Sequence, residues 1–228
     1  MCNRYEQRGS VSQIRKLAKE LGRELKTVPA TDNLPPQDNI YPDQDAPVIR
    51  NATDGSLELV MMLWGFPPIP GEKAPITNIR NLKSRWWRDV NREWITEPQY
   101  RCLVPFTAFA EPVRDSTWFH VPGVEVACFA GIWRPWQGER LAEQTGQKRR
   151  VRTQDEWQLY SFLTTDANDV VKPVHEKAMP VILIDPKEQA EWLNGGEASF
   201  YLQRPLPNEL LTGASDNRLP INFSCNNI

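Results

Sequence analysis

The chain has 228 residues and a hydrophobic content of 40%, which is enough to bury the core of one domain. Its formal net charge of −2 lacks the excess of Lys and Arg that is typical of nucleic-acid-binding proteins, although a local basic groove could still follow a phosphate backbone. The longest apolar runs are far shorter than the ~20 residues of a membrane span, and no secretory leader is recognisable. We therefore expect a cytoplasmic protein with no membrane partner.

The first part of the chain predicts one helix followed by an irregular segment. Ser10 and Gln13 fit a capping box, and apolar residues recur at helical spacing from Val11 to Leu21, before Gly22. Residues 27–47 are rich in Pro, Asp and Asn. We expect this segment to cross the surface or line a cleft without regular strand pairing.

Short strands dominate the rest of the sequence. Apolar and β-branched runs predict strands at residues 48–51, 57–64, 102–106, 118–121, 126–133, 157–164 and 181–184. Helices are predicted near residues 84–91 and 186–193. The pattern indicates an α+β fold, with a single domain over residues 1–228 built on a curved antiparallel β-sheet or barrel and a few flanking helices.

Two further segments are polar or lack a clear pattern. Residues 134–155 lie between predicted strands and include Lys148, Arg149 and Arg150, which predicts an exposed hairpin insertion and leaves open a DNA-contacting arm. Residues 206–228 form a tail whose sequence favours no particular structure.

Cys2 directly follows Met1, and removal of Met1 would leave one residue with both a free thiol and a free α-amine. Such a 1,2-aminothiol condenses with an aldehyde to an imine, and the thiol then closes on the imine carbon to give a thiazolidine. Its position alone also fits an accident of composition. The other cysteines, Cys102, Cys128 and Cys225, form no CxxC pair, which argues against a zinc site or a disulfide framework. We predict no metal and no cofactor.

Three further positions could take part in chemistry, although each also fits a structural role. His175 precedes the apolar run at 181–184 on irregular backbone, where functional residues are frequent. Glu111 follows the apolar run at 103–110, and burial there would raise its pKa and suit it to proton transfer. Asn78 and Arg80 would point to the same side of an extended backbone and could hold a phosphate or sugar oxygen.

A basic cluster with interleaved tryptophans lies between residues 80 and 94. Its members are Arg80, Lys83, Arg85, Trp86, Trp87, Arg88, Arg92 and Trp94. The cluster fits either a solvated helix face whose tryptophans anchor it in the core, or a surface that binds single-stranded DNA.

Several short motifs, taken together and in order, resemble the SRAP (SOS response-associated peptidase) family over residues 2 to about 205. They are MCNRY at 1–5, NIYP at 39–42, WGF at 64–66, TNIR at 77–80, RCLVP at 101–105 leading to Glu111, TTDAN at 164–168, and His175 followed by MPVIL at 179–183. Members of this family act as sensors of abasic sites in single-stranded DNA.

The resemblance implies a role for each of these motifs. Cys2 would capture the ring-opened sugar aldehyde as a stable thiazolidine, Asn78 would hold the cysteine or the sugar, and Glu111 and His175 would transfer protons. In this family the glutamate is also linked to reversal of the cross-link. The remaining motif residues would contact DNA: Arg4 and Arg80 at phosphates, and Pro42 and Trp64 as a wall against which the strand bends. Thr164 or Thr165 would line the pocket, and Asn39 would be a further DNA-binding residue.

The expected function is therefore covalent shielding of abasic sites in single-stranded DNA by a monomer. Two alternatives remain. One is a thiol peptidase or autopeptidase in which Cys2 and His175 act as nucleophile and base. The other is a module that binds single-stranded DNA without a covalent bond, by tryptophan stacking and the basic segment.

Overall fold

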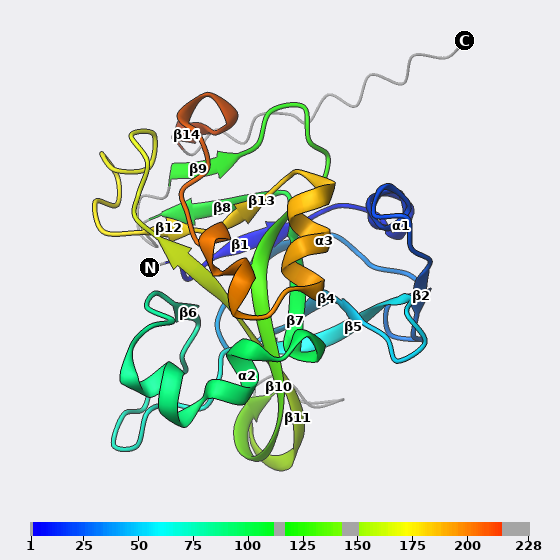
Figure 1. Ribbon diagram of the computed structural model, residues 1–228, viewed down its shortest axis with the longest axis vertical. Coiled ribbons are helices and arrows are strands. Elements are labelled where there is room, and N and C mark those ends of the chain that lie inside the picture. The colour runs from blue at the N-terminus through cyan, green and yellow to red at the C-terminus, as the bar shows by residue number, and fades with distance from the viewer. Residues whose placement is uncertain (1, 112–116, 143–150, 216–228) are drawn as a thin grey trace.

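A five-stranded barrel lies at the centre of the protein (Figure 1). The structure, a computed structural model, describes residues 2–111, 117–142 and 151–215. The strands of the barrel are β4 (Asp45–Asn51), β5 (Leu57–Trp64), β7 (Arg101–Phe106), β10 (Ala127–Ala142) and β11 (Val151–Thr165). Neighbours pair in the order β11-β10-β7-β4-β5, and β5 returns to β11 in parallel, which closes the ring. The short strands β2 (Leu25–Thr27), β6 (Asn78–Ile79), β12 (Met179–Pro180) and β13 (Ile182–Leu183) add to its edges.

A second sheet packs against the barrel and is antiparallel throughout. Its order is β14-β9-β8-β1-β3, formed by β14 (Thr212–Ser215), β9 (Thr117–His120), β8 (Ala108–Glu111), β1 (Tyr5–Gln7) and β3 (Gln37–Ile40). Aromatic rings fill the space between the two sheets. Phe106 stacks on Phe129 with 3.9 Å between ring centroids, and Phe109 stacks on Phe119 at 5.2 Å. The predicted α+β architecture on an antiparallel barrel is confirmed.

Few helices cover this framework. They are α1 (Val11–Glu20), α2 (Arg92–Thr96) and α3 (Pro186–Asn194), the π-helix η1 (Trp86–Val90), and the 3₁₀ turns η2 (Pro98–Tyr100), η3 (Glu197–Leu202) and η4 (Asn208–Leu210). The predicted capping box is present, because Ser10 Oγ accepts from the Gln13 amide and Gln13 Oε1 accepts from the Ser10 amide. α3 begins after Asp185, whose side chain accepts from the Lys187 amide. On the inner face of this helix, Trp192 is fully buried.

The prediction of an irregular segment over residues 27–47 is wrong in part. Residues Gln37–Ile40 form β3 and pair with β1, with Tyr5 opposite Ile40. The sequence QDNI shows no strand pattern, because a free backbone edge on β1 supplies the pairing and only Ile40 is buried. β4 also begins at Asp45, before the predicted start. The helix expected near 84–91 is the π-helix η1, and α2 follows it outside the predicted range.

Within the polar segment 134–155, residues 134–142 and 151–155 pair with each other and extend β10 and β11 beyond the barrel (Figure 1). One of its residues, Arg140, is buried: its guanidinium donates to the Gly65 carbonyl at 2.8 Å and forms an ion pair with Asp43. The predicted arm residues Lys148, Arg149 and Arg150 lie outside the described residues. In the predicted tail, Leu206 and Leu211 are buried and β14 pairs with β9, while residues 216–228 lie outside the described part.

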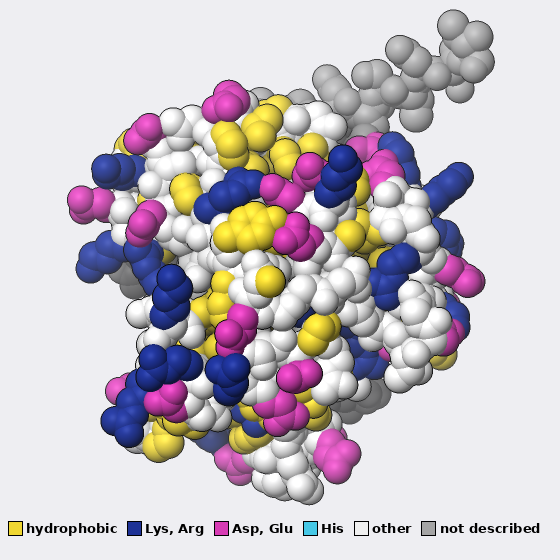
Figure 2. Space-filling model, viewed as in Figure 1, with side chains coloured by type: hydrophobic (Ala, Val, Ile, Leu, Met, Phe, Trp, Pro, Cys, Tyr) yellow, Lys and Arg dark blue, Asp and Glu magenta, His cyan; other side chains and the backbone are white. Residues whose placement is uncertain are grey.

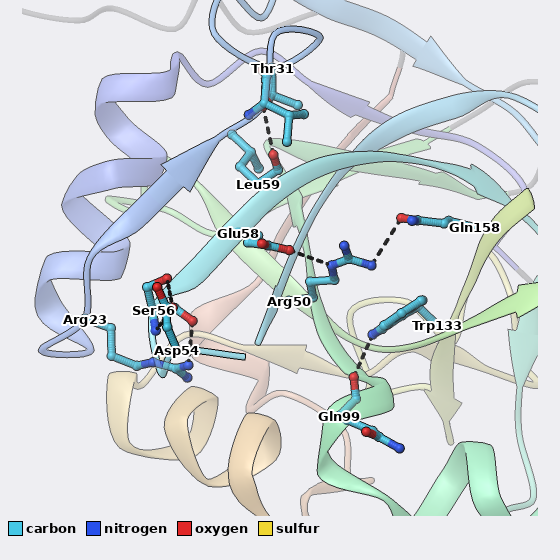
Figure 3. A network of polar contacts seen from close by, with 11 residues as sticks. Arg23, Thr31, Arg50, Asp54, Ser56, Glu58, Leu59, Gln99, Trp133 and Gln158 are labelled. Atoms are coloured by element: carbon cyan, nitrogen blue, oxygen red, sulfur yellow. Dashed lines mark hydrogen bonds and ion pairs between the residues drawn. The ribbon is translucent and has the colours of Figure 1, made fainter. Parts of the chain in front are cut away.

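A polar network spans neighbouring strands on the outer side of the barrel (Figure 3). Arg50 on β4 donates to Glu58 on β5 at 3.0 Å and to Gln158 on β11 at 3.2 Å, and its guanidinium lies 4.6 Å from the Trp133 ring centroid. The Trp133 indole in turn donates to the Gln99 carbonyl at 2.9 Å. These groups satisfy one another, so we assign the network to stability.

Candidate active site

Cys2 lies three residues before β1 and is only 1% exposed. Its thiol donates to the Arg4 carbonyl at 3.4 Å. Burial, and secondly the negative charge of Glu111, raise the pKa of this thiol well above its ordinary value. The sulfur is therefore neutral at physiological pH and needs a base before it can act as a nucleophile.

Asn78 on β6 holds the backbone of Cys2. Its amide nitrogen donates to the Cys2 carbonyl at 2.9 Å and to the Thr77 hydroxyl at 2.7 Å, and that hydroxyl donates to Asn3 Oδ1 at 3.3 Å. The pairing of β6 with β11, Asn78 opposite Phe162, fixes the position of this amide. Within the described residues, Asn78 Oδ1 is buried and has no hydrogen-bond partner. An unpaired buried acceptor of this kind could receive a hydrogen bond from a reacting group.

Glu111 ends β8, the strand that pairs with β1, and this pairing brings it close to Cys2. Tyr5 lies opposite Phe109, and the Ala110 amide donates to the Arg4 carbonyl at 3.0 Å. The Glu111 carboxyl is 2% exposed, and burial raises its pKa to about 7. At neutral pH comparable amounts of the acid and the carboxylate coexist, which suits a group that both gives and takes protons.

His175 lies in the loop before β12, and its Nδ1 is 3.8 Å from Glu111 Oε1. The same nitrogen is 2.8 Å from the Ala178 carbonyl oxygen, an arrangement in which Nδ1 carries the proton and Nε2 is the basic nitrogen. Burial is the main cause that lowers the pKa of His175, so the neutral ring is favoured. The ring is 21% exposed, which places it between the buried carboxyl and solvent.

Two predicted DNA-contacting arginines flank this centre. Arg4 donates to Asn39 Oδ1 at 2.8 Å, and its guanidinium lies 4.6 Å from the Trp118 ring centroid. Arg80 forms an ion pair with Asp166 at 2.5 Å and donates to the Lys177 carbonyl. Both side chains have protein partners here, and an incoming phosphate would have to compete with them.

The other predicted contact residues have different surroundings. Trp64 is fully buried, stacks on Phe162 at 5.3 Å, and donates through its indole to the Thr77 carbonyl at 3.2 Å, so its ring faces the core. Pro42 is half-buried in the turn between β3 and β4. The Thr164 hydroxyl is buried on β11 without a hydrogen-bond partner in the described chain.

The sequence did not predict two residues, Thr77 and Gln203, that hold the predicted site residues in place. Thr77, which connects Asn3, Asn78 and Trp64, was part of a quoted motif but had no assigned role. Gln203 was not singled out, although its amide donates to the carbonyls of Arg80 and Thr164, each at 2.8 Å. No sequence signal identifies such contacts, because they depend on tertiary pairing.

No three His, Cys, Asp or Glu side chains in the described part of the chain come together in a way that could hold a metal ion. None of its helices has the length and apolar character needed to cross a membrane.

The family model for SOS response associated peptidase (SRAP) matches residues 1–215, and no curated protein matches the chain. A solved protein from Bordetella bronchiseptica is similar with a TM-score of 0.68 and 19% identity, over 94% of this chain and 99% of that one. A protein from Bacteroides thetaiotaomicron gives 0.66 and 21%, over 94% and 91%. A phage-related protein from Bordetella bronchiseptica gives 0.61 and 19%, over 95% of each chain. These structures share the fold, and because the family match spans almost the whole sequence, this chain belongs to the SRAP family.

Proposed function

We propose that this protein captures abasic sites in single-stranded DNA by forming a covalent thiazolidine cross-link through Cys2 once Met1 has been removed, and that the cross-link shields the lesion. Membership of the SRAP family supports a role related to abasic sites in the DNA damage response. One observation supports the finer proposal most directly. The Cys2 backbone is held by Asn78, while the buried Glu111 carboxyl is close enough to raise the pKa of the Cys2 thiol.

The proposed reaction joins both groups of the first residue to one sugar carbon. The free amine of Cys2 adds to the C1′ aldehyde of the open-chain sugar, and loss of the hydroxyl as water gives an imine. The thiol then adds to the imine carbon, forming a carbon–sulfur bond, and its proton ends on the ring nitrogen. One molecule of water is released overall.

Glu111 is the proposed proton carrier in both steps. Its protonated form donates to the departing hydroxyl, and the carboxylate that results accepts the proton of the thiol. A pKa near 7 makes both forms available at neutral pH. His175, 3.8 Å from this carboxyl and partly exposed, would exchange the proton with solvent.

Asn78 has the proposed role of positioning the amine. Its nitrogen is already committed to the Cys2 carbonyl, and its buried oxygen has no hydrogen-bond partner in the described chain. That oxygen can accept from the α-amine that removal of Met1 would create, so that the lone pair of the amine faces the aldehyde.

DNA would be held by the residues around this centre. Arg4 and Arg80 would exchange Asn39 and Asp166 for phosphates, a charge-assisted contact that both guanidinium groups can make. Pro42 and Thr164 would line the sugar pocket. Trp64 would act indirectly, because its indole donates to the carbonyl of Thr77 and so helps to position the neighbouring Asn78.

Intact mass spectrometry tests the proposal. The wild-type protein should lack Met1 and, after incubation with an abasic single-stranded oligonucleotide, should gain the mass of the oligonucleotide minus one water. Cys2→Ala should form no adduct that survives heating, while Cys128→Ala, which changes a buried core thiol, should still form it. An adduct with Cys2→Ala, or wild-type protein that retains Met1 in full, would contradict the proposal.

A thiol autopeptidase that removes Met1 is the second candidate, because the family description names a peptidase and His175 lies beside Glu111. Retention of Met1 in His175→Ala, or turnover of a peptide in trans that is lost in this variant, would favour it. Noncovalent binding alone would leave affinity for abasic and intact strands equal in Cys2→Ala and wild type, with no adduct in either.

A further inference from the structure

A second concave feature lies outside the Cys2 centre, between the loop that follows β5 and the segment η1–α2. It encloses about 320 Å³ and is lined largely by aromatic rings and prolines. Its lining includes Phe66 and Ile76 from the segment that follows β5, Trp86 and Trp94 from η1 and α2, and Trp136 from β10; we call this feature the tryptophan hollow. Trp86, Trp94 and Trp136 are half-buried, so part of each is exposed, whereas Trp87, which also lines the hollow, is buried.

The tryptophan hollow is connected to the Cys2 centre by a short backbone ladder. Phe66 and Ile76 exchange both backbone hydrogen bonds, at 2.9 and 3.1 Å. One step further along the same ladder, the Trp64 indole donates to the Thr77 carbonyl, and Asn78 follows directly with its bond to Cys2. Residues 76–78 thus connect the tryptophan hollow to the Cys2 centre through one short stretch of backbone.

The rim of the tryptophan hollow is basic. Arg134 lines it, with its guanidinium 4.4 Å from the Trp94 ring centroid. Arg85 and Arg88 on the adjoining helical segment are exposed and share one carboxylate, that of Asp89. Figure 2 shows Lys and Arg side chains at the lower left of the molecule, over the region of η1 and α2, with Asp and Glu side chains interspersed among them. The local charge thus favours a polyanion although the whole chain is slightly acidic.

Trp86 differs from four tryptophans whose indoles are fixed by hydrogen bonds. The indoles of Trp64, Trp133, Trp157 and Trp192 all donate to backbone carbonyls. The Trp86 indole nitrogen is buried but has no acceptor in the described chain. Leaving such a donor unpaired is unfavourable, and no hydrogen bond fixes the orientation of this ring, so it can adjust to a planar ligand.

We propose that the tryptophan hollow binds a nucleobase of single-stranded DNA that flanks the lesion. The volume of the hollow accommodates a single base, and its aromatic rings can stack on that base. Arg85, Arg88 and Arg134 would contact the adjoining phosphates. Stacking on aromatic rings tolerates any base, as a protein that must act at lesions in any sequence requires. This inference deepens the proposed function and rests on it for the choice of ligand.

The test separates base binding from cross-linking by using intact DNA and a Cys2→Ala background. The probe is a single-stranded oligothymidine that carries one 2-aminopurine, moved along the strand in a series of oligonucleotides. Stacking in the tryptophan hollow should quench the fluorescence at one or two adjacent positions. Trp86→Ala should remove this quenching and weaken binding by about 5- to 150-fold, the range for loss of one stacked base. Tyr201→Ala, at an aromatic residue that is 58% exposed and outside the hollow, is the matched control and should change neither.

A second pair of variants does not depend on a core residue. Val90 lines the tryptophan hollow and is 60% exposed, so its substitution leaves the fold intact. Val90→Asp should weaken binding by repelling phosphates, and Val90→Lys should not. Unchanged quenching in Trp86→Ala together with equal affinities of Val90→Asp and Val90→Lys would overturn the inference. Failure of cross-linking in wild type with quenching still lost in Trp86→Ala would instead refute only the covalent function.

Discussion

Replacement of Glu111 by Gln should make the protein more stable at high pH while leaving the shape of the side chain almost unchanged. Burial raises the pKa of Glu111 from its ordinary value of 4.5 to about 7. The folded state therefore holds a proton that the unfolded state releases earlier. The stability that this proton provides is fully present below pH 4.5, falls as the pH rises, and is gone above about pH 7.

The magnitude follows from the two pKa values. Each unit of difference corresponds to about 1.4 kcal/mol, so keeping the ionised carboxyl buried above pH 7 costs about 3 kcal/mol. At pH 5 the cost is still below about 1 kcal/mol. Glutamine has no charge to bury, so the unfolding free energy of Glu111→Gln relative to wild type should rise by about 2.5 kcal/mol between pH 5 and pH 8.

Urea unfolding at the two pH values measures this difference directly. Each variant is compared with wild type at the same pH, so that effects of other titrating groups cancel. Glu20→Gln, at an exposed carboxylate on α1, is the control and should follow wild type at both pH values. A difference between Glu111→Gln and wild type that stays constant from pH 5 to pH 8 would refute the reasoning from burial.

Three further changes have definite expected results. Asn78→Ala should slow adduct formation by about tenfold, the effect of one lost hydrogen bond to the reacting residue, as followed by denaturing gel electrophoresis; an unchanged rate would remove Asn78 from the mechanism. Gly65→Ala should lower the unfolding free energy by about 1–3 kcal/mol in urea, because φ is +117° and the new Cβ would meet Pro75 at 2.7 Å. Arg101→Met should raise the melting temperature. Two nitrogens of this buried guanidinium have no hydrogen-bond partner in the described chain, and burial lowers its pKa to about 9. A lower melting temperature would show that the contacts of Arg101 with Trp192 and Gly196 outweigh the cost of burial.

Elements with a local signal were predictable, and those formed by distant partners were not. The capping box and apolar spacing of α1 and the run Leu57–Trp64 of β5 specify their own structure. β3 does not, because its pairing depends on the free edge of β1. Arg101 is a further case: no local pattern predicts that an arginine directly before a strand run lies fully buried against Trp192.

The candidate site was predictable as a set of residues but not as a geometry. Residue type and the family resemblance predict Cys2, Asn78, Glu111 and His175, which lie in four separate segments of the chain. Their relative placement follows from the pairing of β1 with β8 and of β6 with β11, which no spacing in the sequence specifies. Trp64 illustrates the limit, since an aromatic residue expected at a wall turns its ring into the core.

The burial of Cys2 also determines which other molecules can reach its sulfur. Thiols react with peroxides and small disulfides when they are ionised and accessible, because the thiolate is the attacking nucleophile, and the buried Cys2 thiol is neither. A nucleophile that is consumed by a single reaction must survive intact until its target arrives. In the proposed function, a protonated and buried sulfur would protect the protein from oxidation until it meets DNA, and the strand would have to displace the covering residues before reaction.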